Sequence, residues 1–114
     1  MGDAGRALLA CVLLATPALA QDVAAPVGNV AAGRKLAAGT CQSCHGMDGL
    51  PKMPDMPTIA GADANYLVKQ LKAYGSGARE NEMMSAVAGM LDEEKMTDAA
   101  AYYAAIKLEA TPPP

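Results

Sequence analysis

One pentapeptide, Cys41-Gln42-Ser43-Cys44-His45, constrains this chain more than any other feature. Two cysteines that flank two residues, followed at once by a histidine, form the attachment pattern of c-type haem. At this spacing the thiols can add to the two vinyl groups of one porphyrin, and the imidazole is held where it can bind the iron. The pattern predicts one covalent haem c, with Cys41 and Cys44 as its thioether residues and His45 as the proximal iron ligand.

Three other uses of the cysteines agree less well with the rest of the chain. A thioredoxin-like Cys-x-x-Cys motif belongs to a βαβ unit, and this alanine-rich sequence shows no such context. A structural zinc site needs four ligands, whereas only Cys41, Cys44 and His45 are plausible here. A disulfide between Cys41 and Cys44 is the simple structural alternative. The haem interpretation explains all three residues, so we prefer it.

The first twenty residues have the composition of a secretory signal peptide. Arg6 supplies a positive charge, residues 7–16 are apolar, and Ala18-Leu19-Ala20 offers small residues for cleavage. The apolar run is shorter than the ~20 residues that a membrane-spanning helix needs. A lipoprotein cleavage site at Cys11 would leave too short an apolar region after Arg6. We therefore expect removal of residues 1–20 and a periplasmic location, with no transmembrane span in the mature chain.

The chain offers little bulk for a hydrophobic core. It contains no Phe and no Trp, and four Tyr are its only aromatic residues. A domain of fewer than about 100 residues already has a marginal core when it is judged on apolar burial. A bound porphyrin would supply the missing apolar volume, so we expect the core to form around the haem. The net charge of −3 argues against a nucleic-acid partner.

Helical patterns recur along the remaining residues, which predicts an all-α fold. Asn29 and Asp63 are typical N-cap residues, and acidic residues from Asp92 onward suit a helix N-terminus. The expected helices cover residues 29–39, 63–74 and 92–109, with a short helix or turn at 81–88. Repeated prolines deny helix to the loop at 46–57. We expect a flexible leader at 21–28, one domain at 29–110 and a tail at 111–114.

Several blocks besides the haem motif occur in a familiar order. They are Gly33-x-x-Leu36, Pro57-x-Ile59-Ala60-Gly61, Tyr66-Leu67-x-x-Gln70-Leu71, Met84, Leu91 and Ala99-Ala100-Ala101-Tyr102-Tyr103-Ala104. In this order and spacing the chain resembles the small bacterial class I cytochromes c. The resemblance implies three to four helices wrapped around one haem. It also implies that the first and last helices cross where Gly33 meets Tyr102.

The resemblance assigns further residues to the haem pocket. Pro57 is implied to accept a hydrogen bond from Nδ1 of His45 through its carbonyl, a contact that fixes the orientation of the imidazole. Ile59 is implied to line the pocket. Arg79 is the only arginine between the middle helix and Met84, and it is a candidate partner for a haem propionate.

The distal iron ligand has several candidates. The chain has no second histidine, which leaves thioether ligation by Met83, Met84, Met90 or Met96. Met96 lies on the apolar stripe of the last helix and is expected in the core. The family's ligand lies seven residues before the apolar residue that leads into the last helix. With Leu91 in that place, the resemblance selects Met84, and the adjacent Met83 is the alternative.

Three functional classes follow from these predictions. The first is a periplasmic one-electron carrier rather than an enzyme, which cycles between Fe(II) and Fe(III) and meets a dehydrogenase, an oxidase or a membrane complex. The second is the haem c subunit of a periplasmic oxidoreductase, such as a flavocytochrome sulfide dehydrogenase. A monomer suits the first class and a heteromer the second. The third, a peroxidatic or ligand-binding haem, needs an open distal position, and Met84 argues against it.

Overall fold

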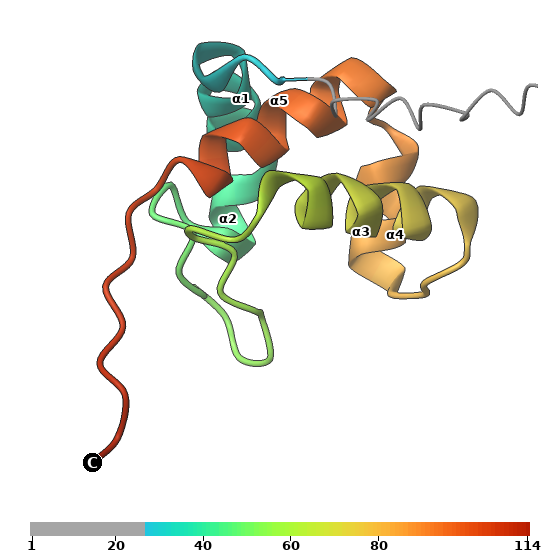
Figure 1. Cartoon of the computed structure of the whole chain (residues 1–114). Helices are drawn as coiled ribbons and strands as arrows, with labels where there is room; N and C mark the ends of the chain where they lie inside the picture. The colour runs from blue at the N-terminus through green and yellow to red at the C-terminus, as the bar shows by residue number, and fades with distance from the viewer. Residues whose placement is uncertain (1–26) are drawn as a thin grey trace, which may run out of the picture.

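The computed structural model describes residues 27–114, so the predicted signal peptide and most of the predicted leader lie outside the described residues. The described part is helical and contains no strand, which confirms the all-α prediction. Its elements are α1 (Val30–Leu36), a π-helical turn η1 (Ala37–Cys41), α2 (Gln42–His45), α3 (Ala64–Ser76), α4 (Glu82–Gly89) and α5 (Glu93–Ala104) (Figure 1). None of the helices within 27–114 has the length and apolar character needed to cross a membrane.

An Asn or Asp side chain begins each of the helices α1, α3, α4 and α5. In every case the side-chain oxygen accepts a hydrogen bond from the backbone N–H three residues later, at 2.8–3.0 Å. The four pairs are Asn29 with Ala32, Asp63 with Tyr66, Asn81 with Met84, and Asp92 with Lys95. These caps satisfy N–H groups that have no partner inside the helix. They explain why the predicted helix starts agree with the observed ones.

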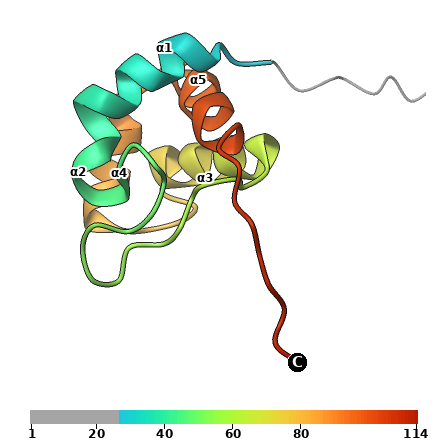
Figure 2. The same cartoon turned by 90° about the vertical axis from the view of Figure 1, so that its left-hand side faces the viewer.

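The first helix is longer than predicted. We expected it to end near Gly39, but α1 continues through η1 into α2 and ends at His45 (Figure 2). The backbone N–H of Gln42 donates to the carbonyl of Ala37, five residues earlier, which is the bond of a π turn. Such turns insert one extra residue without ending the helix and are frequent at functional sites. The haem motif therefore lies on the last turns of a helix and not in the following loop.

The last helix is shorter than predicted. We expected it to reach Glu109, but α5 ends at Ala104. The carbonyl of Tyr103 accepts the N–H of Gly61 from the loop before α3, at 2.9 Å. Gly61 has a φ of +67°, and a Cβ there would lie 3.1 Å from the carbonyl oxygen of Ile106. The loop thus approaches the end of α5 and accounts for its termination.

The helices α1 and α5 cross in direct backbone contact. A Cβ on Gly33 would overlap the carbonyl oxygen of Asp98 and lie 2.9 Å from Cβ of Tyr102. The N–H of Asn29 donates to the carboxylate of Asp98 at 2.6 Å, which fixes the start of α1 at the same crossing. The implied meeting of Gly33 and Tyr102 is confirmed. Gly33 is therefore required for close approach, and this outweighs its cost inside a helix.

Most of the buried apolar side chains among the described residues are small. The buried apolar residues are Ala37, Ala60, Ala88, Met96, Ala99, Ala100 and Tyr103, of which five are alanines. Within 27–114, no large side chain is fully buried. Met96 is buried, as its place on the apolar stripe predicted. The protein atoms alone therefore form a thin core, as the composition predicted.

We predict that Gly33→Ala lowers the free energy of unfolding by about 1–3 kcal/mol, because the new methyl group overpacks the α1–α5 crossing. Urea denaturation of the holoprotein measures this loss. Gly39→Ala is the matched control, since Gly39 lies in the same helical run with no atom within 4 Å of the added Cβ. There alanine should raise stability by up to about 1 kcal/mol. Equal effects of the two substitutions would contradict the close crossing.

Candidate haem site

The imidazole of His45 is held in one orientation by the loop that follows it. His45 is buried at the end of α2, and its Nδ1 lies 3.3 Å from the carbonyl oxygen of Pro57. A carbonyl can only accept, so Nδ1 carries the proton and donates it to this bond. Among the described residues, only this carbonyl lies within hydrogen-bond distance of the ring. In the neutral imidazole this tautomer leaves the lone pair on Nε2, the form in which histidine binds iron.

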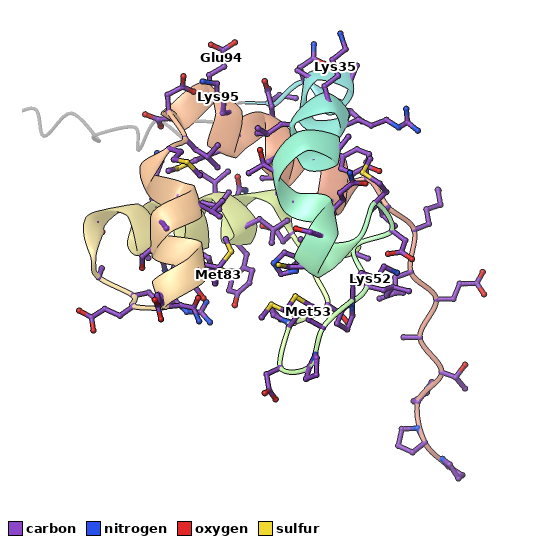
Figure 3. All side chains as sticks on the ribbon, turned by 180° about the vertical axis from the view of Figure 1, so that it is seen from behind. Lys35, Lys52, Met53, Met83, Glu94 and Lys95 are labelled. Atoms are coloured by element: carbon purple, nitrogen blue, oxygen red, sulfur yellow. The ribbon has the colours of Figure 1, made fainter. Side chains whose placement is uncertain are left out.

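The two cysteines of the motif are half-buried, free thiols. Burial raises the pKa of the Cys41 thiol, and the nearby Tyr103 hydroxyl partly offsets that rise. The Cys44 thiol lies 3.8 Å from the thioether sulfur of Met53, which comes from the loop just below the end of α2 (Figure 3). Neither thiol of the motif forms a disulfide, so both are available for the two thioether bonds of a c-type haem.

Two tyrosines of α5 hold the turn that follows His45. The Tyr103 hydroxyl donates to the carbonyl of Gly46 at 2.9 Å, and the Tyr102 hydroxyl donates to the carbonyl of Met47 at 2.7 Å. Their rings meet edge to face, with centroids 5.1 Å apart. Burial raises the pKa of Tyr103, so its hydroxyl keeps its proton and remains a donor. The sequence predicted the position of both tyrosines on the last helix, but it did not predict these bonds.

The loop from Gly46 to Pro57 folds back onto the motif. The N–H of Lys52 donates to the carbonyl of Cys44 at 2.9 Å, and the N–H of Ile59 donates to that of Gly49 at 2.9 Å. A Cβ on Gly49 would lie 2.7–2.8 Å from backbone and side-chain atoms of Ala60, which explains the glycine with its φ of +71°. Ile59 is half-buried beside this contact. The bonds keep Pro57 next to His45.

The candidate distal ligands differ in exposure. Met84 is half-buried near the start of α4, whereas its neighbour Met83 is 54% exposed. Met90, after the end of α4, is 67% exposed, and Met96 is part of the core. Met84 is thus the candidate on α4 that is neither largely exposed nor occupied in the core. Its ligation of iron stays a prediction.

Arg79 contacts the end of α3. Its guanidinium donates to the side-chain oxygen of Gln70 at 2.7 Å and lies over the ring of Tyr74, with Cζ 4.7 Å from the centroid. Its backbone N–H donates to the carbonyl of Ala73 at 3.0 Å. Arg79 therefore fixes the loop between α3 and α4. Its pairing with a propionate stays a prediction.

The described residues fit a covalent haem. The motif presents two free thiols and an imidazole whose Nε2 lone pair is available for iron. Apart from Met96 and Tyr103, the buried apolar side chains are alanines, which leaves volume that a porphyrin would fill. The donor set and the small core together define the site of a c-type haem protein.

Comparison with known proteins agrees with this class. The family model described as cytochrome c matches residues 30–107 of this chain. The chain therefore belongs to the cytochrome c family. Haem c, bound covalently and with its iron, is the cofactor of that family and of this protein.

Among curated relatives, the chain is 40% identical over 84 residues to cytochrome c4 of Thiocapsa roseopersicina. This match covers 74% of this chain and 43% of the relative. It is 40% identical over 79 residues to cytochrome c-554(548) of Halomonas halodenitrificans, covering 67% of this chain and 94% of the relative. It is 41% identical over 83 residues to the thiosulfate dehydrogenase electron acceptor of Stutzerimonas stutzeri, covering 72% of this chain and 36% of the relative.

Solved structures confirm the fold. Reduced cytochrome c4 from Pseudomonas stutzeri matches with a TM-score of 0.65 and 25% identity, over 72% of this chain and 53% of that one. A thiosulfate dehydrogenase from Marichromatium purpuratum matches with a TM-score of 0.64 and 38% identity, over 76% of this chain and 22% of that one. The chain thus spans about half the length of the cytochromes c4 that it matches. The class I cytochrome c fold is shown.

We predict that Tyr103→Phe destabilises the holoprotein by about 1–3 kcal/mol, because the buried Gly46 carbonyl loses its donor. Tyr102→Phe is the matched comparison, since its bond to Met47 is only partly buried and water can replace it. Its loss should stay near 0.5–1.5 kcal/mol. Denaturant unfolding of both variants measures the difference. A Tyr103 variant as stable as the natural protein would disprove the importance of the buried bond.

Proposed function

We propose that this protein is an exported one-electron carrier whose c-type haem is bound by His45 and Met84. The observation that supports it most directly is the buried imidazole of His45, whose Nδ1 bonds to Pro57 and leaves Nε2 available for iron. When bound, the haem iron supplies the Fe(II)/Fe(III) couple. The protein's part is to attach the group, to fix its axial ligands and to exclude water from it.

Each residue has a separate role in this proposal. Cys41 and Cys44 form the thioether bonds, which make the attachment permanent. Pro57 holds the ring of His45 and raises the basicity of Nε2. Met84 supplies a neutral thioether, which favours Fe(II) and raises the reduction potential. We further propose that Ile59 lines the pocket and that Arg79 lies close enough to pair with a propionate.

The partner in this proposal is a redox protein. One relative is named an electron acceptor of thiosulfate dehydrogenase, and one structural neighbour is a thiosulfate dehydrogenase. Both names support a carrier that takes electrons from a periplasmic dehydrogenase. They equally support the second candidate function, a haem c subunit held permanently in such an oxidoreductase or in a flavocytochrome of the sulfide dehydrogenase type. Residues 1–20 support export to the periplasm, the compartment in which either function operates.

We predict that Met84→Ala removes the weak red absorption band of ferric haem with a thioether ligand, lowers the reduction potential and opens the iron to carbon monoxide. Met83→Ala is the matched control, because it removes an adjacent thioether that is more exposed. The control should keep the band and the potential. Optical spectroscopy and potentiometry measure both. If the Met83 variant alone loses the band, Met83 is the ligand and this proposal has the wrong residue.

We predict that a free carrier exchanges electrons quickly with small redox reagents, with a salt dependence set by its net charge of −3. A cationic oxidant such as cobalt tris(phenanthroline) should react more slowly as salt rises, and anionic ferricyanide more quickly, because salt screens both interactions. Stopped-flow oxidation measures the rates, and gel filtration from the native host tests for a partner. A salt-resistant complex with a flavoprotein would favour the subunit, and rapid peroxide turnover would refute both functions.

A further inference from the structure

The helix that contains Met84 is short, and its buried residue lies near its C-terminal end. It has eight residues, and helices of that size are not stable without outside contacts. Its one buried residue is Ala88, near the C-terminal end. At its N-terminal turn, Met83 is exposed and Met84 is half-buried among the described residues. The position of Met84 therefore depends on what fixes the start of α4.

A pair of reciprocal hydrogen bonds fixes that start. The side-chain oxygen of Asn81 accepts the backbone N–H of Met84 itself at 3.0 Å. In return, the N–H of Asn81 lies 3.3 Å from the hydroxyl oxygen of Ser85, which accepts it. The Asn81 carbonyl also accepts the N–H of Ser85 at 2.8 Å. Asn81 is thus bonded on three atoms to the two residues at the candidate ligand position.

The loop before Asn81 is itself attached to α3. Gly77 has a φ of +80° and ends α3 in the left-handed conformation. Arg79 follows, with its backbone bond to Ala73 and its guanidinium against Gln70 and the ring of Tyr74. These contacts give Asn81 a fixed support on a longer helix. The path from α3 to Met84 thus runs through the hydrogen bonds of Arg79 and Asn81.

From this geometry we infer that Asn81 is a positioning residue for the distal iron ligand. Its side chain sets where α4 begins and so holds the thioether of Met84 in place for the iron. The inference rests on the proposed ligation by Met84. It adds that the strength of the iron–sulfur contact depends on a polar side chain three residues before the ligand.

Competition with imidazole tests this role in the holoprotein. Imidazole binds ferric haem only when Met84 leaves the iron, so its apparent affinity reports how firmly Met84 is held. Asn81→Ala should tighten imidazole binding roughly fivefold, the equivalent of about 1 kcal/mol for a lost N-cap. Asn81→Ser, which restores a capping oxygen, should stay within about twofold of the natural protein. Ser85→Ala removes only the reverse bond and should shift the affinity in the same direction by less.

Asn29→Ala is the matched control, because Asn29 caps α1 through the same atoms at 2.9 Å, at the opposite end of the helical run that ends at His45. It should lower thermal stability as Asn81→Ala does but leave imidazole affinity unchanged. Equal imidazole affinity in the Asn81 and Asn29 variants would overturn the inference, as would an unchanged affinity in both Asn81→Ala and Ser85→Ala. Met84→Ala separates the two proposals. If this variant binds imidazole with unchanged affinity, both the ligation by Met84 and the role of Asn81 are refuted. If its imidazole affinity changes and that of Asn81→Ala does not, only the role of Asn81 is refuted.

Discussion

The close crossing of α1 and α5 is the contact on which the rest of the structure depends. Because Gly33 has no Cβ, the backbone of α1 lies directly against Asp98, and the N–H of Asn29 bonds to the Asp98 carboxylate there. With α5 fixed in this position, the hydroxyls of Tyr102 and Tyr103 reach the turn after His45. The contact between the first and last helices thus fixes the turn that follows the haem motif.

The sequence predicted those parts of the fold that short-range chemistry determines. Asn29 and Asp63 were recognisable as caps, since a side-chain oxygen three residues before an unpaired N–H is a local signal. The motif from Cys41 to His45 and the burial of Met96 were equally readable, because spacing and periodicity specify them. The predicted end of the last helix was wrong because the N–H of Gly61, from a distant loop, donates to the carbonyl of Tyr103.

The contacts that the sequence could not predict are hydrogen bonds from side chains to backbone carbonyls. The tyrosine hydroxyls bond to carbonyls 55 and 57 residues earlier in the chain, and every residue carries such a carbonyl, so no residue type marks the partner. The capping of Met84 by Asn81 is different: it has the same local signal as the caps at Asn29 and Asp63, yet only a short helix or turn at residues 81–88 was predicted. The choice of Met84 over Met83 came from family resemblance and not from either side chain's environment.

The π turn at Ala37–Cys41 has a consequence for how this helical run can vary. An α-helix advances about 100° around its axis for each residue, and the π turn accommodates one residue more than a regular turn. A one-residue deletion that converted η1 to regular helix would therefore leave everything after it in phase with α1. Conversion of η1 to regular helix without a deletion would instead rotate everything after it by about 100°. Gly33 would then still face α5, but Cys44 and His45 would point away from Pro57. The π turn thus sets the phase between the crossing point and the haem motif.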